Sequence, residues 1–482
     1  MMRDLSLISR IKWLGTALCI AGAMLVVDTG AWTCDVAVVS GRVTTNGRPL
    51  IWKNRDCSAN WRQQIKYFEA SNMAAGGYVM VFDFDAFALM NNGSPINPSG
   101  GLNESGFVIS CTSVYEEFDQ LNEALNINTE LIRASLSQCV TLADFEYLLK
   151  IWPQVYPGKI LSGNFVAIDA HGGAALYEVY IGSRKKGSPV KYYRFDANNG
   201  SVVDYLGNVI DPGQGDAFIG YVNRTNANTF IAYNYGEERR WRATMILDDL
   251  IEDGRMNYYT VMQEVAKDVV GSQAYNISTS DTNYSTTYCI SRAATRLGMV
   301  VNGVPAGDDP RKCVFWCALG EPSCAVFLPF FPAAREVSEL AYVDNYGLDG
   351  TTPYDMFDTC ILNRAFNRRE AYEKLIYDSN TGNALTGMDD KTINKRELAK
   401  IQQWTIPLEN FIVGKTEQYL AYLRDNPELM TGANLSWFSN YCAEYCLVNY
   451  SQADDNAVPW TFPAVPTGGS PEDWIDEIFS NG

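Results

Sequence analysis

The chain has 482 residues, of which 56 are acidic and 38 are lysine or arginine, so its formal net charge is −18 at pH 7. An acidic protein without a long basic run has no general affinity for nucleic acid, and this excludes nucleic acid as a partner. With one histidine, His171, the chain cannot hold a metal through several histidines, and a hydrolase would need a base of another residue type.

The N-terminus has the pattern of a secretory signal peptide. The basic residues Arg3, Arg10 and Lys12 precede an apolar stretch over residues 13–27, which Asp28 ends. That stretch is shorter than the ~20 apolar residues needed to span a membrane. We therefore expect export to a secreted or periplasmic location, and no stable membrane span once the segment is removed.

The signal segment leads directly to Cys34. Ala31 and Thr33 occupy the −3 and −1 positions of a cut before Cys34. A mature chain that begins there carries a thiol and an α-amine on one residue. The amine, with an ordinary pKa of about 7.7–8.0, can accept the thiol proton at neutral pH. A cut after Ala31 is the alternative, and it would leave Cys34 as an ordinary structural thiol.

Short strand patterns and helical patterns alternate between residues 34 and 332. Strands are predicted at residues 35–41, 49–53, 77–84, 107–112, 165–169, 174–180, 218–222, 299–304, 314–318 and 325–328. Helices are predicted at residues 121–138, 142–151, 240–251 and 260–270, the second with Thr141 as its N-cap. Asn46 and Gly47 indicate a hairpin turn after the first strand. Strand groups separated by helices predict two sheets packed face to face with helices outside, an α+β fold.

His171 lies in the sequence Asp-Ala-His-Gly-Gly, between the strands predicted at residues 165–169 and 174–180. Two strands separated by a short Gly-rich segment predict a hairpin. We therefore expect His171 to be a loop residue and not a catalytic base.

The patterns divide the chain into three segments. Residues 1–33 are the signal peptide, residues 34–335 form one domain, and residues 336–482 form a mainly helical extension packed on the core. Within the extension, helices are predicted at residues 354–377 and 395–424, followed by an acidic tail that contains Pro and Gly. No motif in the extension indicates chemistry.

Cysteine usage agrees with export. Of the 12 cysteines, Cys19 lies in the signal segment and Cys34 is the candidate nucleophile, so an even number remains and disulfides are permitted. The spacing of Cys313, Cys317 and Cys324 does not match a zinc site, and each is expected to be a disulfide partner or a buried thiol. No cofactor and no metal are indicated.

Several motifs follow one another in an order that resembles one enzyme family. They are Cys-Asp-Val-Ala-Val-Val-Ser-Gly at residues 34–41, Trp-Lys-Asn-Arg-Asp at 52–56, Gly-Gly-Leu-Asn-Glu-Ser-Gly-Phe at 100–107, Arg-Thr-Asn at 224–226 and Arg-Arg-Trp-Arg-Ala at 239–243. This order resembles the linear amide C–N hydrolases, an N-terminal-nucleophile (Ntn) group with choloylglycine hydrolases, penicillin V acylases, acid ceramidase and isopenicillin N acyltransferase. The resemblance covers residues 34–332. It implies the αββα sandwich of two stacked, mainly antiparallel sheets and leaves the helical extension unexplained.

The resemblance also implies roles for five residues. Cys34 would be the nucleophile, and Asp56 would bind and orient its α-amine. Asn226 would donate its side-chain amide to the oxyanion, where one donor is worth roughly 2.7–4 kcal/mol. Arg239 would place a charge near the acyl-enzyme. Lys53 stands where bile-salt and penicillin acylases carry arginine, and it cannot form the planar fork of an arginine.

Each of these roles has a structural alternative. Asp56 is otherwise a solvated turn carboxylate, Asn226 a loop asparagine beside the Asn223 glycosylation sequon, and Arg239 part of a basic helix face. An asparagine that many relatives carry is replaced within residues 110–113, so a hydroxyl or a backbone N–H is expected there. Residues 164–175 are expected to be a structural strand pair.

Together these features predict an exported cysteine amidohydrolase that cleaves linear amide C–N bonds through an acyl-thioester on Cys34. Its partner would be a small acyl-amide substrate, and the substitutions near Lys53 leave bile salts, penicillins, N-acyl amino acids and dipeptides all open. The alternatives are an acyltransferase or dipeptidase of the same fold, and a secreted binding protein without activity. A homo-oligomer is left open.

Overall fold

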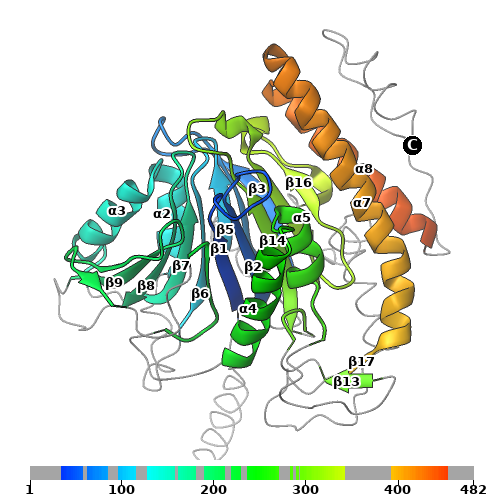
Figure 1. Cartoon of the computed structure of the whole chain (residues 1–482). Helices are drawn as coiled ribbons and strands as arrows, with labels where there is room; N and C mark the ends of the chain where they lie inside the picture. The colour runs from blue at the N-terminus through cyan, green and yellow to red at the C-terminus, as the bar shows by residue number, and fades with distance from the viewer. Residues whose placement is uncertain are drawn as a thin grey trace, which may run out of the picture.

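The computed structural model describes residues 34–57, 62–84, 96–114, 128–157, 161–180, 189–211, 219–228, 236–270, 283–285, 289–292, 294–341 and 392–453. Two β-sheets lie at its centre, with helices on their outer sides (Figure 1). All strand pairs described in the two sheets are antiparallel.

The first sheet has six strands and carries the candidate nucleophile in its interior. Its order is β12-β1-β2-β14-β15-β16. The strands are β1 (Cys34–Val39), β2 (Leu50–Asp56), β12 (Tyr221–Arg224), β14 (Thr295–Asn302), β15 (Val314–Leu319) and β16 (Leu328–Phe330). Gly47, with a φ of +71°, lies in the connection between β1 and β2, in a conformation that glycine adopts without strain. The predicted hairpin is therefore confirmed.

The second sheet has nine strands in the order β11-β10-β9-β8-β7-β6-β5-β4-β3. The strands are β3 (Arg62–Phe68), β4 (Tyr78–Phe84), β5 (Ile96–Asn103), β6 (Val108–Ser113), β7 (Ser162–Ile168), β8 (Ala174–Tyr180), β9 (Lys191–Asp196), β10 (Val202–Asp204) and β11 (Val209–Ile210). Each strand pairs with the next along the chain, so this sheet is a meander. A third, two-stranded sheet joins β13 (Asn283–Ser285) to β17 (Thr392–Asn394).

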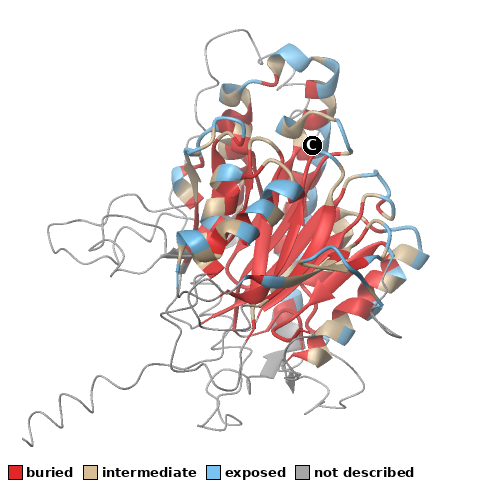
Figure 2. Ribbon diagram, turned by 90° about the vertical axis from the view of Figure 1, so that its left-hand side faces the viewer, coloured by how far each residue is buried: buried red, intermediate tan, exposed pale blue. Residues whose placement is uncertain are grey.

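The two large sheets stack face to face around one buried core (Figure 2). Side chains alternate across a strand, so β1 directs Val36 and Val38 to one face and Ala37 and Val39 to the other. All four are fully buried, as expected for a strand covered on both sides.

Helices α2 (Asn128–Gln138) and α3 (Leu142–Val155) cover the outer face of the nine-stranded sheet. Their apolar side chains pack with Phe107, Phe165 and Tyr177 of that sheet in a second buried cluster. Thr141 is the N-cap of α3, as the sequence predicted, and its side chain and that of Asp144 form a capping box.

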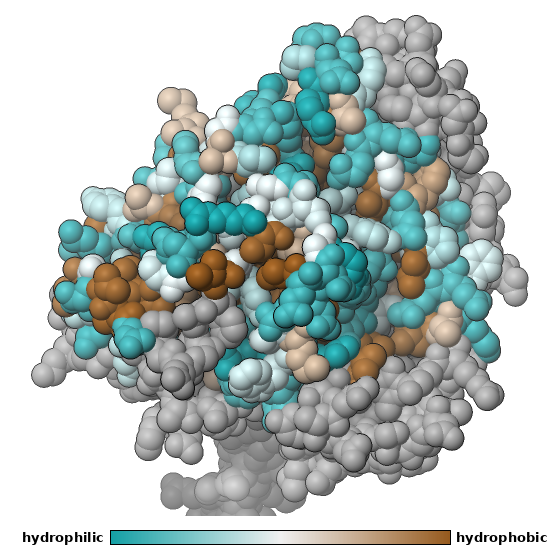
Figure 3. All heavy atoms as spheres, in the orientation of Figure 1, coloured by the Kyte–Doolittle hydropathy of each residue, from teal (hydrophilic) through white to brown (hydrophobic). Residues whose placement is uncertain are grey.

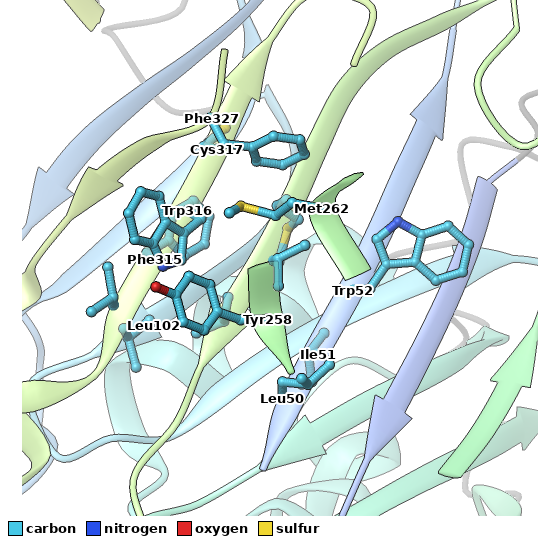
Figure 4. Packing of buried hydrophobic residues seen from close by; sticks show 14 of the residues in the cluster. Leu50, Ile51, Trp52, Leu102, Tyr258, Met262, Phe315, Trp316, Cys317 and Phe327 are labelled. Carbon is cyan, nitrogen blue, oxygen red and sulfur yellow. The ribbon is translucent and has the colours of Figure 1, made fainter. Parts of the chain in front are cut away.

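Helix α4 (Glu237–Glu252), helix α5 (Tyr258–Thr260) and the π-helix η3 (Val261–Ala266) cover the outer face of the six-stranded sheet. Tyr258 stacks on Trp316 of β15, with ring centroids 5.4 Å apart, and Met262 lies beside them (Figure 4). The order helices, sheet, sheet, helices confirms the predicted α+β class and αββα layering.

The structure differs from the sequence-based prediction in several elements. Strand β5 was not predicted, because Pro98, Gly100 and Gly101 are residue types depleted in strands; pairing with β4 and β6 overrides that preference. The helix predicted at 260–270 is mostly the π-helix η3. The helix predicted at 354–377 lies outside the described residues.

The cysteines are thiols in the described part of the chain. All ten described cysteines, Cys34 included, are buried thiols outside any disulfide. For these residues the buried-thiol alternative is correct and the disulfide alternative is wrong. A free buried cysteine behaves as a small apolar side chain, so each of these thiols can be part of the packed interior without a disulfide.

The C-terminal helices α7 (Lys395–Asp425) and α8 (Gly432–Ala453) pack on the six-stranded sheet and on each other. Helix α8 falls where the sequence predicted a tail. Aromatic packing holds this helix in place, since the ring of Phe438 stacks on Tyr419 of α7 with centroids 4.2 Å apart and also contacts the ring of Phe331.

Glu409 fixes α7 to the core. Its carboxylate is fully buried and accepts hydrogen bonds from Lys267 Nζ at 2.9 Å, from the backbone N–H of Phe327 at 2.8 Å, and from the side chain of Gln263. Lys267 Nζ also donates to the carbonyl of Ala325 at 2.9 Å. Burial of this pair is tolerated because both charged groups have their hydrogen bonds satisfied.

The surface agrees with the acidic composition. On the face seen in Figure 3 it is largely hydrophilic, with separate small hydrophobic patches. Within the described ranges, no helix combines the length and the apolar character that crossing a membrane requires.

Replacing Glu409 with alanine should destabilise the protein by about 3–5 kcal/mol, because it leaves the Lys267 ammonium buried without its counter-charge. Urea unfolding followed by circular dichroism measures the effect. Asn410→Ala is the matched control, since Asn410 bonds the exposed hydroxyl of Tyr259 and its loss should cost about 0.5 kcal/mol or less. Equal effects of the two variants would contradict the interpretation.

Candidate active site

Cys34 is the first residue of β1 and is only 6% exposed. Its backbone N–H donates to Asn226 Oδ1 at 2.9 Å. Asn226 follows β12, which pairs with β1 from Val36↔Arg224 to Val39↔Tyr221. The antiparallel register therefore delivers the asparagine to the start of β1, although the two residues are 192 positions apart in sequence.

The side-chain amide nitrogen of Asn226 donates to the carbonyl of Ser113 at 2.5 Å. Ser113 ends β6 and lies within residues 110–113, where the sequence predicted a substitute for the family's asparagine. Asn226 thus joins the start of β1 in one sheet to the end of β6 in the other. Its role as an oxyanion donor remains a prediction.

The face of the six-stranded sheet that bears the Cys34 side chain also bears cations. Cys34 pairs with Arg55, and Val36 pairs with Lys53, and directly paired residues share a face. Both Lys53 and Arg55 are buried, and the Arg55 guanidinium donates to Gln63 Oε1 at 2.6 Å. The sequence motif did not single out Arg55 as a site residue.

Lys53 places its ammonium between the sheets. Nζ donates to the carbonyl of Cys111 at 2.5 Å and to that of Ser99 at 3.2 Å. Within the described residues no carboxylate forms an ion pair with it. Lys53 therefore contributes an unneutralised positive charge beside the candidate nucleophile. Burial raises the pKa of the nearby Cys111 thiol to about 11, and the positive charge of Lys53 opposes this rise.

A second buried cation on this face is neutralised. Arg224 of β12 forms an ion pair with Glu178 of β8, with Nε 2.7 Å from Oε1, and the guanidinium lies over the ring of Phe195. This pair connects the two sheets next to the Asn226 segment. Sequence analysis did not identify it, because the two partners are 46 residues apart in different strands.

The opposite face of the same sheet carries two ion pairs. Arg239 of α4 donates through Nε to both carboxylate oxygens of Asp35, at 3.0 and 3.2 Å. Asp56 accepts from Arg292 Nε at 2.7 Å and from Thr295 Oγ1 at 2.6 Å. All four charged residues are buried. The alternatives of a solvated carboxylate for Asp56 and a solvated basic helix face for Arg239 are therefore wrong.

The structure brings Cys34, Asn226 and Lys53 together by contact or by shared face, and it places Asp56 and Arg239 beneath the strand on the helix side. The predicted bond from Asp56 to the α-amine remains a prediction, since here Cys34 contributes a peptide nitrogen. Asp35 is the partner of Arg239 that sequence reasoning missed.

Burial raises the pKa of Asp35 from its usual value to about 6; the Arg239 guanidinium opposes this shift, whereas the nearby Asp56 carboxylate adds to it. Desolvation exceeds the attraction of the ion pair at this position. Asp35 therefore changes charge in a mildly acidic range, one residue away from the candidate nucleophile.

Asn54 holds β2 to the outer helices. Its side-chain nitrogen donates to the carbonyls of Ala266 and Ile290 at 2.9 and 3.2 Å, and its oxygen accepts from Trp52 Nε1 at 3.0 Å. Lys53 and Arg55, on either side of Asn54, are thereby directed to the opposite face. The Trp-Lys-Asn-Arg-Asp motif thus supplies both faces of the site.

Two other predictions concern residues away from the site. His171 is exposed in the turn between β7 and β8, where its backbone N–H donates to Asp169 Oδ1 at 2.9 Å, as predicted for a loop residue. Asn223 is buried, and its amide donates to Arg240 O and Thr244 Oγ1, each at 3.1 Å. The glycosylation alternative is therefore wrong for this folded chain.

No group of three or more His, Cys, Asp or Glu side chains suited to a metal ion occurs in the part of the chain that the structure describes. The chemistry visible at the site is that of a thiol, an amide, a buried ammonium and three carboxylate–guanidinium pairs.

Comparison with known proteins extends this description. No protein-family model and no curated protein matches the chain. Among solved structures, it is similar to the Caenorhabditis elegans N-acylethanolamine-hydrolyzing acid amidase ortholog, with 12% identity and a TM-score of 0.35 over 59% of this chain and 99% of that one. It is also similar to a mutant of the conjugated bile acid hydrolase from Clostridium perfringens, with 11% identity and a TM-score of 0.31 over 60% of this chain and 89% of that one.

A second variant of the Clostridium perfringens enzyme gives 14% identity and a TM-score of 0.30 over 59% of this chain and 89% of that one. At these identities and TM-scores the likeness says nothing of substrate or mechanism.

The raised pKa of Asp35 predicts a pH-dependent stability difference between the wild type and Asp35→Asn. The folded state takes up a proton at about pH 6, whereas the unfolded carboxyl does so near its usual 3.8, so this group makes folding less favourable as pH rises through that window. The wild-type stability minus that of Asp35→Asn should fall between pH 4 and 6 and then stay constant. Melting temperatures at half-unit pH steps measure it, and a difference that rises with pH would refute the assignment.

Proposed function

We propose that this protein is an exported cysteine hydrolase that cleaves linear amide bonds, with Cys34 as the N-terminal residue of the mature chain. The observation that carries the proposal is the Cys34 nitrogen bound by the Asn226 amide at the start of a buried central strand. Every buried backbone N–H needs a hydrogen-bond partner, and here that partner is a side chain that also donates to Ser113 of the other sheet. A nucleophile whose own amine acts as base requires that the amine be held in place.

The proposed reaction has two steps. The α-amine takes the proton of the Cys34 thiol, the resulting thiolate attacks the amide carbonyl, and the ammonium passes that proton to the leaving nitrogen as the C–N bond breaks. Water then attacks the acyl-thioester, releasing the carboxylic acid and restoring the thiol. Transfer of the acyl group to another acceptor would use the same acyl-enzyme, so an acyltransferase or a dipeptidase remains within the proposal.

The surrounding residues have distinct tasks in this scheme. Lys53 stabilises negative charge on the thiolate and the tetrahedral intermediate, because it is a buried cation to which no carboxylate of the described residues is paired. Asn226 orients the amine through Oδ1 and presents its NH₂ group to the oxyanion. Asp56 and Arg239 support β1 from the helix side, and Asp56 also attracts the ammonium form of the amine.

Replacing Cys34 with serine in a chain that begins at residue 34 should lower amide turnover by orders of magnitude, because a hydroxyl is a far weaker nucleophile than a thiol near pH 7. Intact mass of the exported wild type identifies its first residue, and hydrolysis of acyl-amide libraries measures turnover. Cys139→Ala, at a thiol on the far side of the second sheet, is the control and should keep its activity. A stable start at Trp32, or full activity in Cys34→Ser, would contradict the mechanism.

Asn226→Ala should lower kcat by about 10²–10³-fold with a smaller change in KM, as expected when a donor used in the transition state is removed. His171→Ala should leave kcat nearly unchanged, because the base is the α-amine and His171 lies in an exposed turn. Steady-state kinetics on any responsive acyl-amide compare the two. A large loss in His171→Ala with little in Asn226→Ala would mean that the site lies elsewhere.

A further inference from the structure

A second buried asparagine holds the segment that carries Asn226. Asn164 lies on β7 of the nine-stranded sheet and is fully buried. Its side-chain nitrogen lies 2.9 Å from the carbonyl of Thr225 and 3.1 Å from the carbonyl of Ala227. These two carbonyls belong to the residues directly before and after Asn226, so one amide group binds the backbone on both sides of it.

Thr112 of β6 completes the arrangement. Its hydroxyl donates to the Thr225 carbonyl and accepts from Asn164 Nδ2 at 3.0 Å. Two residues of the second sheet therefore converge on the same short segment. The next residue of β6, Ser113, accepts from the side chain of Asn226 itself.

This support is needed because β12 is the edge strand of its sheet. The described pairing of β12 with β1 ends at Val36↔Arg224, two residues before Asn226. The contacts described above come from the opposite sheet. They set how far the Asn226 amide reaches over the start of β1.

The side-chain oxygen of Asn164 distinguishes this hydrogen-bonding arrangement from ordinary core packing. In the described part of the chain, Asn164 Oδ1 is buried and has no hydrogen-bond partner. An unsatisfied buried oxygen costs free energy, and an apolar side chain on β7 would avoid that cost. What asparagine adds at this position is the pair of donors directed at the Asn226 segment.

We propose that Asn164 is a positioning residue that acts on the reaction through Asn226. This inference rests on the proposed function, and it replaces the expectation that residues 164–175 serve structure alone. Asn164 does not touch the reacting atoms. It fixes the Thr225–Ala227 backbone so that Asn226 meets the Cys34 nitrogen on one side and the oxyanion on the other.

A double-mutant cycle tests the inference. Asn164→Ala should lower kcat by about 10–100-fold with little change in KM, because misplacement of a catalytic group by about 1 Å has effects of this size. In the Asn226→Ala background the same substitution should cause no further loss, since the residue through which it acts is already gone. If the loss of kcat in the double variant equals the product of the two single losses, the proposal is overturned.

Asn128→Ala is the matched control. Asn128 is also a buried asparagine that supports β7, and its amide donates to the carbonyl of Ser162 at 2.7 Å, two residues from Asn164. It makes no contact with the Asn226 segment among the hydrogen bonds described. Its substitution should leave kcat near the wild-type value, and an equal loss in Asn128→Ala would show that any weakening of β7 suffices.

A second readout does not depend on turnover. The rate at which iodoacetamide alkylates Cys34 in a chain beginning at that residue, followed by mass spectrometry, reports how the amine is held beside the thiol. Asn164→Ala and Asn226→Ala should change this rate to a similar extent, and the double variant no further. Absence of amide turnover in the wild type would overturn the proposed function, whereas additive alkylation effects would overturn the role of Asn164.

Should Asn164→Ala fail to fold, Thr112→Val takes its place in the same cycle. Valine has nearly the shape of threonine and lacks the hydroxyl that donates to Thr225. Combined with Asn226→Ala, Thr112→Val should cause no further change in kcat or in the alkylation rate of Cys34. Additive changes would again overturn the proposal.

Discussion

The antiparallel pairing of β1 with β2 on one side and β12 on the other is the constraint on which the rest of the site depends. The register Cys34↔Arg55 fixes which residues of β2 share the face of the thiol. The register that ends at Val36↔Arg224 brings Asn226 to the Cys34 nitrogen. A slip of one residue in either pair would turn every side chain of that strand to the other face.

Because side chains alternate, this one strand separates two electrostatic environments. The face toward the second sheet holds the thiol and the Lys53 ammonium, which carboxylates do not neutralise within the described residues. The face toward the helices holds Asp35 and Asp56, each bonded to an arginine. Positive charge is therefore available where a thiolate would form, whereas each carboxylate on the helix side is already balanced by an arginine.

The C-terminal helices are linked to this arrangement through three consecutive residues at the end of η3 and just beyond it. The carbonyl of Ala266 accepts from Asn54 of β2, Lys267 forms the buried pair with Glu409 of α7, and Asp268 binds Arg242 of α4. Each of these elements carries or supports a residue of the site. The extension is thus part of the packing that holds the strands of the candidate site, although it contains no chemical motif.

The sequence by itself determined the alternation of strands and helices, the hairpin after β1, the cap at Thr141 and the positions of Cys34, Lys53 and Asn226 in recognisable motifs. These depend on local patterns, which act over a few residues. Only the tertiary structure decided the partners: Asp56 meets Arg292 across 236 positions, Arg239 meets Asp35 across 204, and Asn164 meets Ala227 across 63. Such contacts follow from register and sheet stacking, and a linear sequence carries no local signal for either. For the same reason β5, rich in Gly and Pro, becomes a strand only because its neighbours offer it hydrogen bonds.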